Sequence, residues 1–360
     1  MTDDLERFGI DPSDPLADYL GGTVRFLLEK GYAPGDIAAM EPAARHAMSW
    51  RLIFGPGGEP MTVEAVAAAS GVPLEQVRTL VRALGFASDA DDELEMTAED
   101  VDLVRLFNTA GQLMGRAEVL HLCRVIGASM ARIAEAATSS SRVSVETPLR
   151  DEGTYLDFLH LSEMIGRDFM PTLTAAFDRI FRYHVLAGSA LPWEMDADQA
   201  AMTTQRAIGF ADMVGFTEHA GTVTTKELVA IVDDFEGRVT DAVVSSGGRV
   251  VKFIGDEVLF SFTDASACCA CARALLKLAA DEAIREVRIG LTYGNVIARF
   301  GDIYGPVVNM AARLVSVAPP GAVLVTPEIA EHAGDAFAFE AREPVVVKGI
   351  DRPVANLLLR

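Results

Sequence analysis

The chain has 360 residues, 50% of them hydrophobic, which is enough for two domains with separate apolar cores. Its 52 acidic and 31 basic residues give a formal net charge of -21, which excludes a bulk attraction to nucleic acid or anionic lipid because both require a positive surface. No apolar run reaches the ~20 residues that span a bilayer, and the N-terminal MTDDLERFGIDPSD lacks a signal pattern, so we expect a cytoplasmic protein without a transmembrane segment.

Residues 1–195 are typical of a helical regulatory domain. Segments such as LADYLGGTVRFLLEKGY place apolar residues three and four positions apart, with Gly or Pro between segments. The polar stretch from Ser139 to Pro148 is expected to break the helices, and a helical connector over about 150–195 follows it. His184 lies near the end of this connector, and because histidine in general can change its charge near neutral pH, this position makes it a hypothetical pH sensor.

The segment from Met61 to Phe86 has the layout of a helix-turn-helix, with a turn at Gly71. The second helix carries four apolar residues, Val77, Leu80, Val81 and Leu84. DNA binding would require basic residues there, but only Arg78 and Arg82 are present, and acidic residues crowd positions 89–95. We therefore predict a structural helix pair and no nucleic acid partner.

From about residue 200, strand-like and helical segments alternate, which is typical of an α+β domain. The expected strands are RAIGFADM, RVVKFI, EVLFSF, EVRIGLTYG, AVLVT and EPVVVKGI. Helices over Lys226–Ser245 and about Ala265–Ala280 complete a ferredoxin-like palm over residues 200–360, with its helices on one sheet face. The three cysteines of the second helix lack a nearby fourth metal ligand, so we interpret them as buried apolar residues.

Two aspartates stand at the ends of neighbouring expected strands. Asp212 ends the strand in IGFADMVGF, and Asp256 lies at the turn of the hairpin GGRVVKFIGDEVLFSF. Such a pair suits two hard divalent cations that hold a triphosphate. The turn after Asp212, with Gly215, Phe216 and Thr217, would direct backbone N–H groups toward phosphate oxygens. The pattern predicts a metal-dependent nucleotide site.

The same hairpin and one further motif contribute polar residues to this prediction. KFIGDEV adds Lys252, and GDIYGPVVNMAARL adds Asp302, Asn309 and Arg313. Asn309 and Arg313 are four positions apart, so they share one face of an expected helix. The six residues fall in three separate motifs, which argues against unrelated surface positions.

These motifs resemble the class III nucleotidyl cyclase catalytic domain, and specifically its adenylate cyclase branch, over roughly Thr203 to Arg360. The whole chain is similar in layout to the actinobacterial soluble adenylate cyclases, in which a helical N-terminal regulatory domain precedes one cyclase domain. In the N-terminal half the resemblance rests on the helical spacing of apolar residues, on the stretch LLEKGYAPGDI and on the segment 61–86. The resemblance implies conversion of ATP to 3′,5′-cyclic AMP and pyrophosphate by in-line attack of the ribose 3′-OH.

The resemblance also implies roles for the motif residues. Asp212 and Asp256 would hold two Mg²⁺ or Mn²⁺ ions. Lys252 and Asp302 would select the purine, because Lys donates to N1 of adenine and Asp accepts from its 6-amino group. Guanine presents the reverse order of donor and acceptor, so the pair favours ATP over GTP.

Asn309 would orient the ribose, and Arg313 would neutralise charge on the α-phosphate. In this family the metal aspartates of one subunit face the other four residues of its partner, so the resemblance implies a homodimer with two equivalent sites. Lys348, in VVVKGIDRP, is similar to a family lysine that reaches the triphosphate. Asn295 departs from the pattern, since some members carry a phosphate-binding arginine at this position. Part of the triphosphate-binding contacts is therefore not assigned to a residue of this chain.

Other interpretations stay open at this point. A guanylate cyclase is disfavoured by the purine pair, and a diguanylate cyclase by Ile254 and Val258, which depart from its GGDEF turn. The alternative from another class is a DNA-binding or ligand-sensing regulator with a degenerate cyclase domain, and the acidic helix-turn-helix and the six intact positions count against it. We also expect the helical domain to inhibit the enzyme until a signal, protons or a lipid, shifts its population of states.

Overall fold

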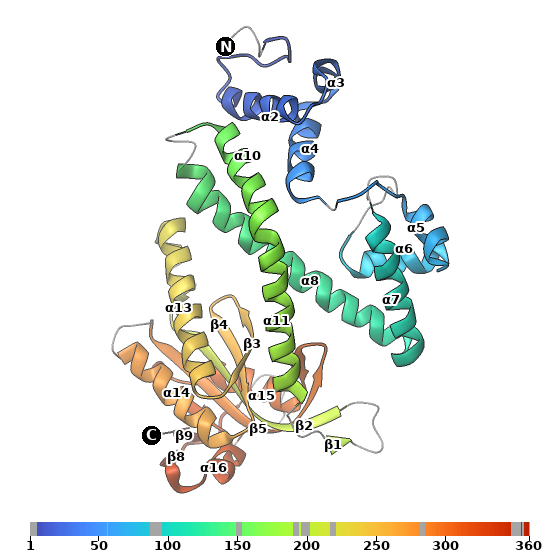
Figure 1. Ribbon diagram of the computed structural model, residues 1–360. Coiled ribbons are helices and arrows are strands. Elements are labelled where there is room, and N and C mark those ends of the chain that lie inside the picture. Colours follow the sequence, from blue (N-terminus) through green and yellow to red (C-terminus); the bar gives the residue numbers. More distant parts are fainter. Residues whose placement is uncertain are drawn as a thin grey trace. The chain divides into compact units, whose positions relative to one another are not determined.

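The structure is a computed structural model that describes residues 6–55, 57–86, 96–148, 153–189, 194–195, 202–216, 221–280, 285–346, 354 and 356–359. The chain divides into two compact units, Met1–Ala190 and Leu191–Arg360, and each has its own architecture. Figure 1 shows helices in the first unit and a sheet flanked by helices in the second. Within the described residues, no helix is long and apolar enough to span a membrane.

The first unit is helical, as the spacing of its apolar residues predicts. Its α-helices are α2 (Ala17–Glu29), α3 (Pro34–Ala39), α4 (Pro42–Phe54), α5 (Val63–Ser70), α6 (Leu74–Ala83), α7 (Ala98–Met114), α8 (Arg116–Ser141), α10 (Tyr155–Met164) and α11 (Met170–Ser189). Local chemistry sets their ends: Thr154 and Asp157 form a capping box at the start of α10, and Gly71 ends α5 with a φ of 72°. The predicted helix-turn-helix geometry is therefore confirmed as α5 and α6.

Separate apolar clusters hold this unit together. Helices α5 to α8 bury one cluster, in which Val77 and Cys123 are fully enclosed. Helices α2, α4 and α10 meet around Phe26, Phe158 and Leu159. Burying each such side chain contributes about 1.5–3 kcal/mol, so these clusters stabilise the unit.

Two π-helical turns interrupt the long helices. The turn η2 (Ile165–Phe169) joins α10 to α11, and Pro171 accounts for it because proline has no N–H to donate to the carbonyl of Arg167. The predicted break at Ser139–Pro148 is wrong, since α8 continues through η1 (Arg142–Glu146). Val145 packs against the cluster of α2, α4 and α10, and this contact keeps the polar stretch helical.

The second unit contains a mixed sheet in the order β3-β4-β2-β5-β7-β9-β8. Its strands are β1 (Glu194–Met195), β2 (Met202–Met213), β3 (Arg249–Ile254), β4 (Glu257–Phe262), β5 (Val287–Arg299), β6 (Asp302–Tyr304), β7 (Val323–Val325), β8 (Phe339–Ala341) and β9 (Leu357–Leu359). Five of the six predicted strands are confirmed as β2, β3, β4, β5 and β7. Half of EPVVVKGI, residues 347–350, lies outside the described residues, and in the other half Val345 forms an isolated bridge to Val354.

Helices cover both faces of this sheet. Helices α13 (Thr225–Ser245), α14 (Ala265–Ala280) and α16 (Pro327–Ala333) share one apolar core, which includes the three buried cysteines of α14. Helix α15 (Pro306–Val317) packs on the opposite face against Ile208, Phe210 and Val296. The two predicted helices, α13 and α14, share one face of the sheet, as predicted. The sequence assigned no face to α15, which covers the other one because β2 and β5 are apolar on both faces and each face must be covered.

Gly290 lets α15 approach β5 closely. A Cβ at this position would lie 2.6 Å from both the carbonyl oxygen of Ala311 and the backbone nitrogen of Val315. Real Cβ atoms do not come so near to backbone atoms, so the helix rests directly on the strand at this point. The position of α15 on the sheet is therefore fixed by the absence of a side chain.

Candidate active site

The two predicted metal aspartates lie at one end of three adjacent strands. Asp212 is near the C-terminal end of β2, where its register partners are Glu257 on β4 and Arg288 on β5. Asp256 lies in the turn between β3 and β4. The N–H of Met213 donates to the carbonyl of Asp256 at 3.2 Å and so ties this turn to β2. The backbone thus places both aspartates and Glu257 at the same edge of the sheet.

Arg288 is the counter-ion of Asp212. Its guanidinium lies 2.6 Å from Oδ2 of Asp212 and also donates to the carbonyl of Ser316 in α15 at 3.3 Å. The Asp212 side chain is only 15% exposed, so a charge-assisted hydrogen bond holds this carboxylate where water has little access. Sequence analysis missed Arg288. Its signal was the alternation of VRIGL, which places the arginine on the opposite strand face from the apolar Val287 and Ile289.

Glu257 is the second residue that sequence analysis missed, although it follows Asp256 directly in IGDEV. The pKa of Glu257 is raised to about 7, first by burial and then by the neighbouring carboxylates of Asp212 and Asp256. Arg288 opposes this rise only in part. The edge of the sheet therefore concentrates negative charge, which is the condition that a bound divalent cation relieves.

Lys252 and Asp302 form an ion pair in an open hollow on the sheet face that α15 covers. Nζ of Lys252 lies 2.6 Å from Oδ2 of Asp302, and the two side chains are 41% and 25% exposed. The hollow has a volume of about 510 Å³, and Tyr304 and Asn309 also line it. A donor and an acceptor held side by side can receive a planar ring whose polar edge has the complementary order.

A short hairpin turn presents Asp302. The turn residues Phe300 and Gly301 have φ values of 58° and 82°, as a two-residue hairpin turn requires, and they join β5 to β6. Arg249 of β3 donates to the carbonyl of Gly301 at 2.6 Å. The strand that carries Lys252 therefore also anchors the turn that carries its partner.

Helix α15 carries the other two predicted residues. Its N-cap is Gly305, and Pro306 occupies the first turn, where a missing N–H costs nothing. Asn309 lines the hollow with Lys252 and Asp302, whereas Arg313 lies one turn further along α15 and does not line it. Because Gly290 seats α15 on β5, the location of Asn309 depends on that contact.

A single copy of the chain gathers the predicted residues into two groups. Lys252, Asp302 and Asn309 line one hollow, and neither Asp212 nor Asp256 is part of that lining. One protomer therefore presents a polar hollow and a separate carboxylate edge.

The remaining predicted residues are only partly described. Gly215 turns the chain after β2 with a φ of 70°, and Phe216 packs against the core of the second unit. Thr217 and Lys348 lie outside the described residues. Asn295, the departure from the family pattern, is exposed on β5.

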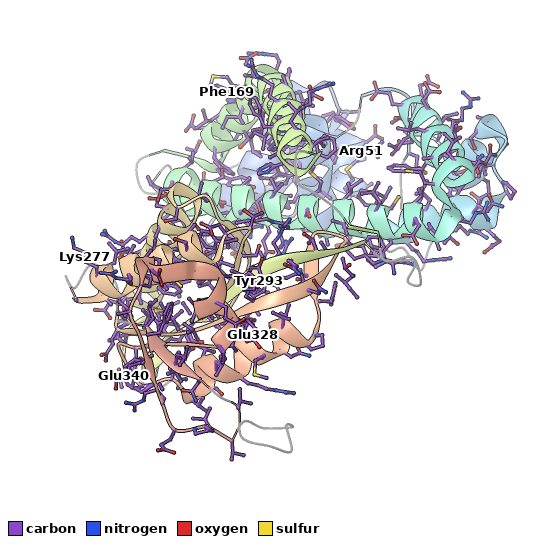
Figure 2. The ribbon with its side chains drawn as sticks, turned by 90° about the horizontal axis from the view of Figure 1, so that it is seen from below. Arg51, Phe169, Lys277, Tyr293, Glu328 and Glu340 are labelled. Atoms are coloured by element: carbon purple, nitrogen blue, oxygen red, sulfur yellow. The ribbon has the colours of Figure 1, made fainter. Side chains whose placement is uncertain are left out.

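Other features that the sequence singled out lie elsewhere. Arg78 on α6 forms ion pairs with Glu64 at 3.1 Å and Glu75 at 3.0 Å, so acidic neighbours already engage it. His184 is exposed on α11. Figure 2 labels Tyr293 and Glu328, which line another hollow of about 330 Å³ in the second unit to which none of the predicted site residues contributes.

The chain is similar to a known protein family, to several relatives and, in part, to solved structures. Residues 199–359 match the family model of the adenylate and guanylate cyclase catalytic domain. An adenylate cyclase of Streptomyces coelicolor is 33% identical over 285 residues, which cover 76% of this chain and 73% of the relative. A pH-sensitive adenylate cyclase of Mycobacterium tuberculosis is 28% identical over 371 residues, covering 97% of this chain and 92% of that protein. Among solved structures, the adenylyl cyclase CyaB of P. aeruginosa matches 45% of this chain and 96% of its own, with 23% identity and a TM-score of 0.41.

Proposed function

The chain belongs to the class III adenylate cyclases, and on that premise we propose that it forms 3′,5′-cyclic AMP and pyrophosphate from ATP at two sites shared between two copies of the chain. The observation that carries this proposal is the grouping of its residues. Lys252, Asp302 and Asn309 line one hollow, while Asp212 and Asp256 stand at another edge of the sheet. A symmetric pair of copies would complete each hollow with the carboxylates of its partner.

The Lys252–Asp302 pair supports ATP as the substrate. In the bound state the ammonium would donate to N1 of adenine, and the carboxylate would accept from the 6-amino group. Guanine would set its O6 against Asp302 and its N1–H against Lys252, so both side chains would lose their partners. This mismatch discriminates against GTP, and by less than the roughly 10⁴-fold of fully buried sites because Lys252 and Asp302 are 41% and 25% exposed.

Asp212 and Asp256 fit divalent cations that arrive with the nucleotide. Among the described residues, no group of three or more His, Cys, Asp or Glu side chains could hold a metal ion. Two aspartates could hold such ions only together with oxygens from another source, and a triphosphate supplies them. When bound, two Mg²⁺ or Mn²⁺ ions would increase the acidity of the ribose 3′-OH and neutralise phosphate charge.

Arg288 and Arg313 would supply positive charge to the phosphates. Arg288 holds the carboxylate of Asp212 in place at 2.6 Å. A cation on Asp212 would compete for the same oxygen and free the guanidinium for a phosphate oxygen. Arg313, with a rigid fork of donors, would stabilise the charge that develops on the α-phosphate, and Asn309 would orient the ribose.

We further propose that the helical unit inhibits the cyclase until a signal acts on it. Two observations support this: the helical unit has apolar clusters of its own, and it carries none of the site residues. Protons are one candidate signal, because the relative from Mycobacterium tuberculosis is named pH-sensitive and His184 is exposed on α11; a lipid is the other. If residues 200–360 alone are as active as the full chain at every pH, the helical unit does not inhibit the enzyme. If His184→Ala leaves the pH dependence of activity unchanged, His184 is not the pH sensor.

A cytoplasmic location is proposed because ATP is available there.

The test of the function is product formation by the full-length protein. Purified enzyme receives ATP or GTP with Mn²⁺ or Mg²⁺, and the cyclic nucleotide is quantified by chromatography. We expect cyclic AMP from ATP, at most a trace of cyclic GMP, and loss of activity in both Asp256→Ala and the isosteric Asp256→Asn. Equal rates with ATP and GTP would overturn the purine assignment, and an active Asp256→Asn would overturn the metal assignment.

A further inference from the structure

A hollow of about 160 Å³ lies in the helical unit between α6, α7 and α8. Its floor is apolar and includes the buried side chains of Leu80, Val104 and Val119. Its rim is polar and consists of Gln76, Thr79, Asn108, Gln112 and Arg116. An apolar floor with a few convergent polar groups is the general form of a small-molecule site.

The charge of this lining differs from that of the chain. The protein has 52 acidic and 31 basic residues, yet Arg116 is the one charged residue in the lining, and no carboxylate is part of it. Gln76 accepts a hydrogen bond from Nη2 of Arg116 and so holds the guanidinium at the rim. The other donors of its fork remain for a ligand. A positive rim without carboxylates selects an anion in a chain that otherwise repels anions.

Two carboxamides reinforce this preference. Asn108 and Gln112 are four residues apart on α7, so they stand one above the other on the same face. Both side chains line the hollow, and each carries an N–H₂ group that can donate hydrogen bonds to a ligand. Together with Arg116 they offer N–H donors from two helices, as a carboxylate with two oxygens requires.

The volume sets the size of the ligand. A cavity of about 150 Å³ holds one benzene molecule, so the hollow of about 160 Å³ suits an apolar body of roughly six carbon atoms. We propose that this hollow binds a small organic monocarboxylate with a compact apolar body, whose carboxylate meets Arg116 and whose body rests on Leu80 and Val104. This site is separate from the cyclase chemistry, since all its lining residues belong to the helical unit.

Benzoate is the probe that matches this description, and the test is isothermal titration of the full-length protein. We expect saturable binding of one benzoate per chain. Benzamide, which has the same shape without the charge, should bind at least about ten-fold more weakly, a difference of about 1.4 kcal/mol. Dodecanoate should bind no better than benzoate, because its chain exceeds the hollow.

Two variants locate the binding in this hollow. Arg116→Gln should weaken benzoate at least about ten-fold, whereas Arg124→Gln, on an exposed part of α8 outside the lining, should leave the affinity unchanged. Gly111→Leu should abolish binding by filling the hollow, since a Cβ there would meet only Cα of Arg116, at an ordinary 3.7 Å.

With the wild-type protein, three results would overturn the proposal. They are the absence of saturation with benzoate at about 10 mM, equal affinities for benzoate and benzamide, and tighter binding of dodecanoate, which would indicate a lipid groove. If Arg116→Gln fails to fold, Gly111→Leu decides, because leucine is a better helix former than glycine and removes no contact. Benzoate binding that persists in a folded Gly111→Leu protein would place the ligand elsewhere and refute the site.

Discussion

Replacing Gly290 by alanine should displace α15 and slow the enzyme without unfolding it. The new Cβ would lie 2.6 Å from two backbone atoms of α15, and ordinary contacts begin at 3.4 Å. The helix must therefore retreat by about 0.8 Å, or the strand must bend away. Overpacking of this kind costs about 1–3 kcal/mol, which a domain with a core of this extent tolerates.

The effect on activity should exceed the effect on stability. Helix α15 carries Asn309 and Arg313, and a displacement of about 1 Å at a reacting centre can cost on the order of 100-fold in rate. We expect kcat of Gly290→Ala to fall by about 10- to 100-fold, with a melting temperature only a few degrees below that of the wild type. The assay is cyclic AMP formation at saturating ATP, together with thermal unfolding followed by circular dichroism.

Gly237 provides a matched control for this experiment. It lies inside α13, where an added Cβ meets no atom within 4 Å, so Gly237→Ala should retain full activity and gain up to about 1 kcal/mol of helix stability. If Gly290→Ala keeps the wild-type kcat and melting temperature, α15 is not seated as described. A loss of activity in both variants would show that the assay reports a general disturbance.

Further predictions concern single side chains. Asp302→Asn should lower the ratio of ATP to GTP turnover by at least about ten-fold, because an amide can also donate to O6 of guanine; an unchanged ratio would refute its purine role. Arg313→Ala should lower kcat by about 10²- to 10³-fold with little change in KM, and a change in KM alone would assign it to ground-state binding. Burial lowers the pKa of His46 below its normal value of 6.5 in the folded protein. The unfolded chain therefore takes up a proton at this histidine at a higher pH than the folded chain, so the free energy of unfolding decreases as the pH falls below about 6.5. Thermal unfolding between pH 8 and pH 5 should show a smaller decline in His46→Phe than in the wild type, and equal declines would contradict the assignment.

The sequence predicted most secondary structure of the second unit because its signals are local. Strand alternation in RVVKFI and EVLFSF and the helix pattern of α13 and α14 depend on neighbouring residues alone, and the structure has these elements at the predicted positions. The segment from Ser139 to Pro148 was misjudged because the contact of Val145 with α2, α4 and α10 is not local. The placement of α15 on the opposite sheet face likewise depends on Gly290, whose role appears only when β5 and the helix meet.

The candidate site shows the same division. The six motif residues could be selected from the sequence, but their grouping into a hollow and a carboxylate edge depends on sheet register. The pairing of Asp212 with Arg288 arises because β2 and β5 are neighbours at that level, although 76 residues separate the two positions. Glu257 follows Asp256 directly in the sequence. Its raised pKa could not be predicted from that position, because it comes from burial and from Asp212 on the neighbouring strand.

The central claim is that each site takes its residues from two copies of the chain, and subunit complementation tests it most directly. Asp256→Ala and Lys252→Ala should each be inactive alone. When the two are co-expressed with different tags, random pairing gives about half mixed dimers, each with one intact site, so we predict about a quarter of the wild-type activity. No recovered activity in mixed dimers that are purified through both tags would contradict the shared site.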